Sequence, residues 1–246
     1  MKQPYFSIII PTLNEEKFLP LLLEDLTQQK EGDFEVIVVD GASDDATLKS
    51  ISRFDKVLNL KFLTVKKRNV AFQRNYGARC AVGQYLVFLD ADSHIDHLFM
   101  KKLKKEIQTH KHLLFIPLIS PQEASYQDSL IFHVVNFLIE ASHKVGNPLS
   151  SGGSMIVERN YFRFLKGFNE RLFLSEDHDI IKRARKGGVN AYFSKTIKVQ
   201  FSLRRMKKEG RFDLLRKYII ASLHHFTNED IDEKIFEYKM GGDAYK

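Results

Sequence analysis

The chain of 246 residues lacks tryptophan, has a single cysteine and contains no long apolar run. One cysteine cannot form an intramolecular disulfide, which is typical of proteins from reducing compartments. No stretch approaches the roughly 20 apolar residues that a membrane-spanning helix needs. The short apolar run at residues 7–10 meets Pro11 at once and does not fit a signal peptide. We therefore expect a cytoplasmic protein.

Glycine-rich phosphate-binding motifs are also missing. Neither GxxxxGK[ST] nor GxGxxG occurs in the sequence. This absence argues against a P-loop enzyme and against a dinucleotide-binding Rossmann domain. Any phosphate that the protein binds must then be neutralised by a metal ion and by Lys or Arg side chains.

Basic charge is concentrated near the C-terminus. The net charge of the chain is +7, and residues 195–217 alone contain nine Lys or Arg against two Asp or Glu. This distribution favours a local anionic partner and gives no reason to expect nucleic-acid binding. Residues 204–223 also carry apolar side chains at helical spacing, which is typical of a basic amphipathic helix. Such a helix either contacts an anionic membrane surface, on the inner face of the membrane, or packs on the core; the sequence leaves both open.

The first half of the chain alternates apolar strands with helices. Strands are predicted at residues 7–10, 36–39, 60–65 and 85–89, and helices over residues 18–26, from about Asp45, and over residues 70–82. Asn14 is the expected N-cap of the first helix. Alternating strands and helices predict βαβ units, and uninterrupted apolar strands predict a sheet that is covered on both faces. The fold class is therefore α/β, a Rossmann-like three-layer sandwich with a mostly parallel central sheet.

Polar loops follow three of these strands, at residues 11–15, 40–45 and 90–96. Because ligands bind beyond the carboxyl ends of parallel strands, these loops should lie at one edge of the sheet. In the third loop, Asp90 and Asp92 are separated by one residue and should point to the same side. Two carboxylates this close repel each other unless a cation lies near them. Mg²⁺ or Mn²⁺, shared with phosphate oxygens, fits such a pair, whereas the simpler alternative is a solvated acidic loop.

Five segments together carry a resemblance to a known family. These are "SIIIPTLNEE", "VIVVDGASDDAT", "RNYGA", "YLVFLDADS" and "GGSMIVERNYFRFLKGFNERLFLSEDHDIIKRARKGG". In this order and spacing, over about residues 5–205, they resemble the family 2 glycosyltransferases with the GT-A fold. The resemblance implies an inverting, metal-dependent enzyme. Such an enzyme moves one sugar from a nucleotide-diphosphate sugar, with a UDP-sugar favoured, to a hydroxyl acceptor.

The resemblance also implies roles for single residues. Asp177 matches the catalytic base, although acids at a helix start are common for other reasons. Asp90 and Asp92, with Ala91 between them, match the metal-binding D-x-D motif. Gly152 and Gly153 match a turn that shapes the sugar and acceptor pocket. The matching donor-binding positions are Pro11, Thr12, Glu15 and Asp40, with Arg204 and Arg205 as basic residues that close over the diphosphate.

The sequence departs from the family pattern at one basic position. Val70 stands where an arginine is frequent, so Arg68 or Arg74 is expected to make the donor contact instead. His224 or His225 is a candidate third metal ligand, although a surface histidine without a ligand is the commoner case. The Q-x-x-R-W motif of processive synthases is absent, which favours a single addition over polymer synthesis.

The same resemblance implies a domain organisation. Residues 1–205 are expected to form one catalytic GT-A domain, with a nucleotide-binding half at about 1–95 and an acceptor half at 96–205. Residues 206–246 are expected to form a helical appendage. A lipid-linked acceptor or a cell-surface glycan precursor would suit membrane contact. Two other interpretations stay open: a nucleotidyltransferase that makes a nucleotide sugar, and a non-catalytic module that binds a nucleotide sugar or a membrane.

Overall fold

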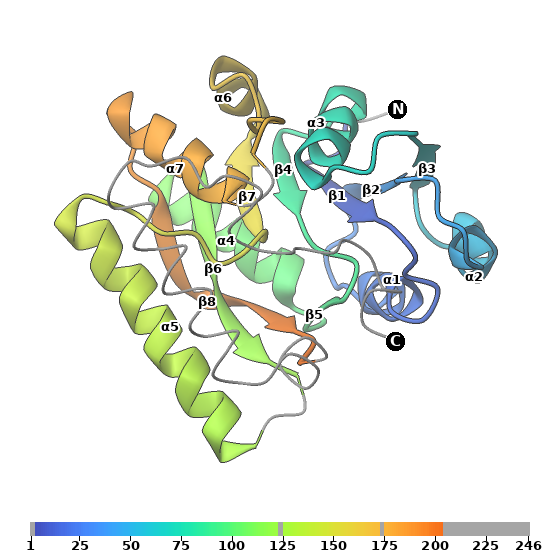
Figure 1. Cartoon of the computed structure of the whole chain (residues 1–246), viewed down its shortest axis with the longest axis horizontal. Helices are drawn as coiled ribbons and strands as arrows, with labels where there is room; N and C mark the ends of the chain where they lie inside the picture. The colour runs from blue at the N-terminus through green and yellow to red at the C-terminus, as the bar shows by residue number, and fades with distance from the viewer. Residues whose placement is uncertain (1–2, 123–124, 173–174, 204–246) are drawn as a thin grey trace.

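The computed structural model describes residues 3–122, 125–172 and 175–203 (Figure 1). In the first half the elements are β1 (Phe6–Thr12), α1 (Leu19–Thr27), β2 (Phe34–Asp40), α2 (Thr47–Ile51), the 3-10 helix η1 (Ser52–Lys56), β3 (Leu60–Thr64), α3 (Val70–Cys80), β4 (Tyr85–Phe88) and β5 (Ser93–Ile95). The second half contains α4 (Phe99–His110), β6 (Leu114–Pro121), α5 (Tyr126–Val145), β7 (Met155–Glu158), α6 (Arg159–Phe164), α7 (Glu176–Lys186) and β8 (Tyr192–Phe201).

One mixed sheet runs through the molecule in the order β3-β2-β1-β4-β7-β6-β8-β5. The strands β3, β2, β1 and β4 pair parallel in that order, and β4 pairs antiparallel with β7 on its other side. Beyond β4, the neighbours β7 and β6 pair antiparallel, β6 and β8 pair parallel, and β5 returns antiparallel to β8. In the described residues, parallel pairings therefore outnumber antiparallel ones. The predicted α/β class with a mostly parallel sheet is confirmed.

Helices cover both faces of this sheet, because alternate strand residues point to opposite sides. Ile8 and Ile10 pack in a core with α1 and α4, whereas Ile9 packs in a second core with α3, α6 and α7. Figure 1 shows α1 and α3 on opposite sides of β1 and β2. Both cores consist of many fully buried apolar side chains, so the sheet gives the loops at its edge firm support.

The three polar loops predicted from the sequence lie at the same edge. β1 is parallel to both β2 and β4, and the register places Thr12 beside Asp40 and Ile9 beside Phe88. The carboxyl ends of these strands therefore point the same way, as a βαβ arrangement requires. The loop after β1 therefore lies near the loops after β2 and β4, which follow it in the chain by about 30 and 80 residues.

The predicted role of Asn14 is wrong. Helix α1 begins at Leu19, and its N-cap residue is Phe18, which makes no side-chain cap. Asn14 instead has a positive φ of 53° and links two loops, because its side-chain oxygen accepts a hydrogen bond of 2.8 Å from the backbone N–H of Asp44. Asparagine tolerates this left-handed conformation better than most residues, which explains its place in the loop.

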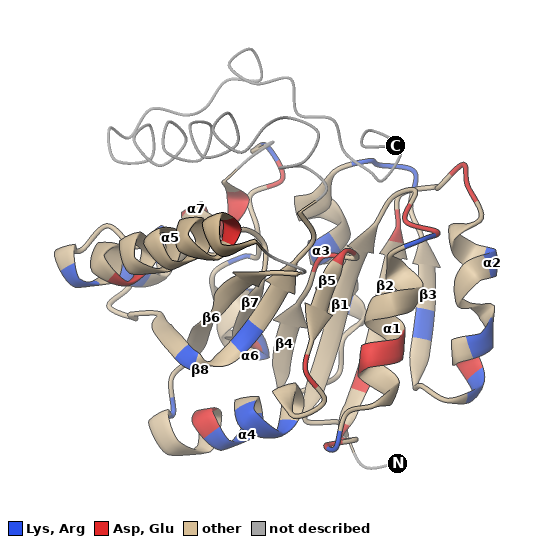
Figure 2. Cartoon of the chain, turned by 90° about the horizontal axis from the view of Figure 1, so that it is seen from below, with Lys and Arg blue, Asp and Glu red and all other residues tan. Residues whose placement is uncertain are grey.

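Several predictions concern residues 204–246, which lie outside the described part of the chain. They are the donor contacts of Arg204 and Arg205, the metal contact of His224 or His225, the membrane contact of residues 204–223 and the helical appendage. Within the described residues, α4 carries a row of lysines, visible in Figure 2. No helix in that part of the chain combines the length and the apolar character needed to cross a bilayer.

Candidate active site

The ends of β1 and β2 are joined by one buried glutamine. The side-chain amide of Gln73, on α3, donates hydrogen bonds of 2.8 Å to the carbonyl oxygens of both Thr12 and Val39. The backbone N–H of Gly41 also donates to the Thr12 carbonyl oxygen, at 2.8 Å. Sequence reasoning did not single out Gln73. Gln73 could have been identified as a polar residue on the buried face of a predicted helix.

Asp40 is buried at the end of β2, where a nucleoside was predicted to bind. Its carboxylate accepts hydrogen bonds from the backbone N–H of Ser43, at 2.9 Å, and from the Ser43 hydroxyl. Arg68 lies beside the same loop, where it pairs with Asp44 at 2.6 Å and donates to the carbonyl oxygen of Ala42 at 2.9 Å. Arg68 therefore braces the loop after β2.

The β1 loop lies against the same region. Pro11, Thr12 and Glu15 are all buried. The backbone N–H of Glu15 donates a 2.9 Å hydrogen bond to the hydroxyl oxygen of Thr47, at the start of α2. The predicted nucleoside-binding residues thus lie together at the carboxyl ends of neighbouring strands.

Arg74 lies at the centre of a buried charged cluster. One terminal nitrogen pairs with Asp90 at 2.7 Å and the other with Glu176 at 2.6 Å, and only 2% of the Arg74 side chain is exposed. Burial disfavours the charged guanidinium, but Asp90 and Glu176 outweigh burial and raise the pKa of Arg74. The guanidinium therefore stays charged and holds both carboxylates in place.

The D-x-D segment lies directly after β4. Ala91 is buried, and Asp90 and Asp92 are partly exposed on either side of it. Ala91 and Asp92 form a turn between β4 and β5, which the backbone N–H of Ser93 closes by donating to the carbonyl oxygen of Asp90 at 3.0 Å. The side chains of the two aspartates are thus partly exposed at the edge of the sheet, whereas Ala91 belongs to the core.

Asp177 lies in the first turn of α7, next to the same cluster. Its carboxylate accepts a hydrogen bond of 3.1 Å from the backbone N–H of Gly153 and pairs with His178 Nδ1 at 2.9 Å. Burial opposes ionisation of Asp177, but His178 and Arg74 outweigh it, and its pKa lies below the ordinary value. The helix dipole acts in the same direction. Asp177 is therefore an ionised carboxylate at neutral pH, while the pKa of His178 is raised by the same pair despite burial.

Glu176 behaves differently from its neighbour. Burial and the nearby carboxylate of Asp177 raise the pKa of Glu176 to about 7, although Arg74 opposes the shift. Two adjacent acids thus have pKa values that are driven apart by their surroundings, a pattern that is frequent at functional sites.

Gly153 joins the two halves of the site. Its φ is +98°, and a Cβ atom there would lie 2.5 Å from Nη2 of Arg74 and 2.8 Å from Oδ2 of Asp90. Its backbone N–H meanwhile contacts Asp177. A single glycine therefore lies against the D-x-D carboxylate on one side and against the predicted base on the other.

The carboxylates present fit a hard divalent cation. Within the described ranges, no group of three or more His, Cys, Asp or Glu side chains forms a metal site by itself. Mg²⁺ and Mn²⁺ are commonly held by one or two carboxylates together with substrate phosphates and water. Asp90 and Asp92, at the open edge of the sheet, provide that number and kind of ligand.

A comparison with protein families identifies the family to which this chain belongs. The model of "Glycosyl transferase family 2" matches residues 7–165, which is more than half of the chain. The chain belongs to glycosyl transferase family 2. The matched region contains the strand ends, Arg74, the D-x-D segment and Gly153, whereas Glu176 and Asp177 lie beyond it.

Curated relatives match part of the family 2 chain. Over 109 residues, or 43% of the chain, it is 35% identical to the poly(ribitol-phosphate) beta-N-acetylglucosaminyltransferase TarS of Staphylococcus aureus. Over 94 residues it is 40% identical to a PGL/p-HBAD biosynthesis glycosyltransferase of Mycobacterium tuberculosis. These matches cover 19% and 37% of the relatives' own lengths.

Solved structures confirm the predicted GT-A glycosyltransferase fold. The S. aureus TarS crystal structure superposes on 94% of this chain and 41% of its own, with a TM-score of 0.65 and 20% identity. The mannosyltransferase PcManGT of Pyrobaculum calidifontis, in complex with GDP-Man and Mn²⁺, superposes on 81% of this chain and 57% of its own. Its TM-score is 0.66 at 22% identity.

We predict that Gly153→Ala destabilises the protein more than Gly188→Ala. Both glycines have positive φ, at +98° and +83°, but a Cβ on Gly188 would meet nothing within 4 Å. Backbone strain should cost the Gly188 variant about 1 kcal/mol, and the Gly153 variant about 3 kcal/mol because Arg74 and Asp90 must also move. Urea unfolding of the two variants and the wild type measures the difference. Equal losses would show that the space around Gly153 is not constrained.

A second prediction concerns pH and Glu176. Because its pKa is raised to about 7, the folded protein holds a proton there that the unfolded chain releases near pH 4.5. The contribution of Glu176 to stability is thus fullest below pH 4.5 and falls as the pH rises toward about 7. The advantage of the wild type over Glu176→Gln in urea unfolding should therefore shrink by about 2 kcal/mol between pH 5 and pH 8. A constant difference would mean that Glu176 is ionised throughout.

Proposed function

We propose that the chain transfers one sugar from a nucleotide-diphosphate sugar, with a UDP-sugar as the leading candidate, to an acceptor hydroxyl with inversion at the anomeric carbon. The observation that carries this proposal is the position of Gly153, whose backbone N–H bonds Asp177 and where an added Cβ would lie 2.8 Å from Oδ2 of Asp90. A diphosphate held near Asp90 would place its sugar within reach of Asp177.

In this proposal, Asp177 is the catalytic base. The acceptor oxygen forms a bond to the anomeric carbon while the bond from that carbon to the diphosphate oxygen breaks, and Asp177 takes the hydroxyl proton. General base catalysis requires a carboxylate that is ionised before the reaction. The lowered pKa of Asp177 supports this role, and its hydrogen bond from Gly153 fixes the direction of the carboxylate.

The proposed donor site lies at the ends of β1 and β2. Asp40 binds the base edge of the nucleoside, and Pro11, Thr12 and Glu15 form the rest of that pocket. Asp90 and Asp92 hold Mg²⁺ or Mn²⁺, which neutralises charge on the leaving diphosphate. Structures of relatives in complex with UDP, with UDP-GlcNAc, and with GDP-Man and Mn²⁺ support both parts.

Arg74 acts through other residues in this scheme. Both of its terminal nitrogens already bond carboxylates inside the protein, so its proposed task is to orient Asp90 toward the donor and Glu176 beside Asp177. Arg68, which is about half exposed, remains the candidate for a direct donor contact.

The acceptor is proposed at the level of its reacting group only. A hydroxyl satisfies the chemistry of Asp177, and the names of the relatives, which refer to poly(ribitol phosphate) and to PGL biosynthesis, support a cell-surface or lipid-linked precursor. We further propose that residues 1–95 bind the nucleotide and that residues 96–205 bind the acceptor.

The donor site is tested by UDP binding with and without a metal. We expect UDP to raise the unfolding temperature in Mn²⁺, and we expect EDTA or Asp92→Ala to weaken UDP binding roughly tenfold or more, since ligand binding stabilises the folded state by mass action. The exposed Asp55 of η1 provides a matched control, because Asp55→Ala removes a carboxylate from an element that carries none of the proposed site residues. Equal UDP binding in EDTA would rule out the metal assignment.

A further inference from the structure

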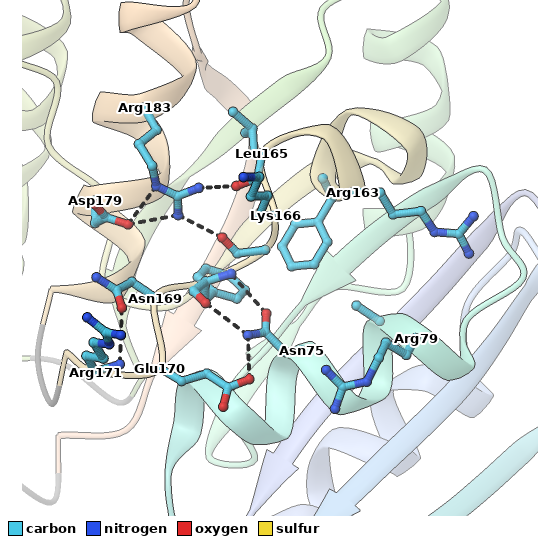
Figure 3. Close-up of a pocket in the computed structure, with 14 residues that line it drawn as sticks. Asn75, Arg79, Arg163, Leu165, Lys166, Asn169, Glu170, Arg171, Asp179 and Arg183 are labelled. Carbon is cyan, nitrogen blue, oxygen red and sulfur yellow. Dashed lines mark hydrogen bonds and ion pairs between the residues drawn. The ribbon is translucent and has the colours of Figure 1, made fainter.

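A cavity lies beside α3, and its lining residues differ from those of the candidate active site. It has a volume of about 680 Å³ and lies between α3, α6, α7 and the loop at residues 165–171 (Figure 3). Neighbouring residues of α3 face different sites, because Arg74 bonds Asp90 whereas Asn75 bonds the loop. The same division holds on α7, where Asp177 contacts Gly153 and Asp179 lines the cavity. The cavity thus shares helices with the candidate active site and none of the side chains placed there.

Asn75 fixes the loop that forms one wall. Its side-chain amide donates to the carbonyl oxygen of Phe168 at 2.9 Å and accepts from the backbone N–H of Phe168 at 2.9 Å. The same amide donates to Glu170 at 3.0 Å. Gly167 must be a glycine here, because its φ is +70° and a Cβ would lie 2.5 Å from Oδ1 of Asn75. These hydrogen bonds and the glycine backbone therefore fix the conformation of the loop.

Arg183 fixes the same loop from α7. It pairs with Asp179 at 2.8 Å and donates to the carbonyl oxygens of Gly167, at 2.7 Å, and of Leu165. Both acids of the cavity are consequently engaged, since Glu170 also pairs with Lys67 at 3.1 Å. Each carboxylate of the cavity is therefore already paired with one cation.

Four more cations line this cavity: Arg79, Arg163, Lys166 and Arg171. All four are exposed to solvent, and none of them forms an ion pair with another described residue. Figure 3 shows Arg79 and Arg163 at one side of the cavity and Arg171 at the other. Charges of one sign around a concave, low-dielectric wall concentrate anions from solution.

We propose that this cavity binds a phosphate group that is separate from the donor diphosphate. Guanidinium groups present paired N–H donors that match phosphate oxygens, and a lysine adds a compact positive charge. A cavity of this volume accommodates a phosphate ester of about the size of a sugar phosphate. The bound phosphate is either a free ion or the ester of a larger molecule, and both present the same oxygens to Arg163 and Lys166. The inference holds whether or not the chain is a transferase.

The test compares phosphate binding by three forms of the full chain. These are the wild type, the double variant Arg163→Gln/Lys166→Gln, and the matched control Lys101→Gln/Lys105→Gln on the exposed face of α4. Inorganic phosphate and glycerol 3-phosphate are titrated by calorimetry at constant ionic strength, with saturating UDP and Mg²⁺ to occupy the donor site. We expect affinity to fall roughly tenfold in the cavity variant and to be unchanged in the control.

The outcomes of this test distinguish the two possible ligands and include results that would contradict the proposal. Stronger binding of glycerol 3-phosphate identifies an ester as the ligand, and stronger binding of inorganic phosphate identifies the free ion. Equal affinities in all three proteins, or no binding by the wild type, would overturn the proposal. UDP titration of the same proteins tests the donor site separately. If UDP does not bind, the proposed donor site is wrong, and the difference between the cavity variant and its control still tests the cavity.

Discussion

Asp177→Asn should abolish sugar transfer and leave UDP affinity unchanged. The amide has nearly the same shape as the carboxylate and can still accept the hydrogen bond from Gly153, but it cannot take a proton from an acceptor hydroxyl. General base catalysis is worth about 10² to 10⁴ in rate, so kcat should fall by roughly that factor. Release of UDP from UDP-sugar in the presence of an acceptor extract measures the rate, and calorimetry measures UDP affinity.

Asp179→Asn is the matched control for this variant. Both aspartates lie in the first turn of α7, so both substitutions remove the same favourable interaction with the helix dipole. Only Asp177 contacts Gly153, whereas Asp179 holds Arg183. If Asp177 were simply an acid at a helix start, the two variants would lose similar activity. Full activity in the Asp177 variant would remove this residue from the catalytic role.

The parallel strands, and the common edge at which their polar loops lie, followed from local sequence patterns. The apolar strands at residues 7–10 and 36–39 each precede a polar loop and a helix, and the chirality of βαβ units leaves few ways to arrange them. The parallel order β3-β2-β1-β4 is the result. The glycine turn at residues 152–153 predicted the strand that follows it, β7, but the antiparallel pairings of β5 and β7 did not follow from the sequence, because a short apolar run does not indicate its partner strand.

The contacts within the candidate site could be predicted only in part. Asp90 stands out beside a buried strand, and the resemblance pointed to Asp177. The pairing of Arg74 with Glu176 joins residues that are 102 positions apart, so no local pattern predicts it. The role of Asn14 was misjudged for a related reason, since a capping residue and a loop-bridging residue have the same short polar side chain.

Arg74→Met should be the most destabilising single substitution of a charged residue in the site. Methionine fills a similar volume, but the change leaves the carboxylates of Asp90 and Glu176 without the cation that bonds both. Breaking a buried pair by removing one partner typically costs about 3 to 5 kcal/mol, because the remaining charge is uncompensated. Urea unfolding at pH 8, above the pKa of about 7 for Glu176, measures this loss. Arg68→Met, which removes an exposed ion pair to Asp44, should cost less than about 1 kcal/mol.

The double variant Arg74→Met/Glu176→Gln separates lost charge compensation from lost packing. If the cost arises from unpaired carboxylates, removing the charge of Glu176 should restore part of the stability that Arg74→Met loses, and lowering the pH should do the same for the single variant. If the cost arises from packing, neither change should help. Such a rescue would be a measurable coupling energy between the two positions, and it would show that Arg74 stabilises the site by compensating the charge of Glu176 and Asp90.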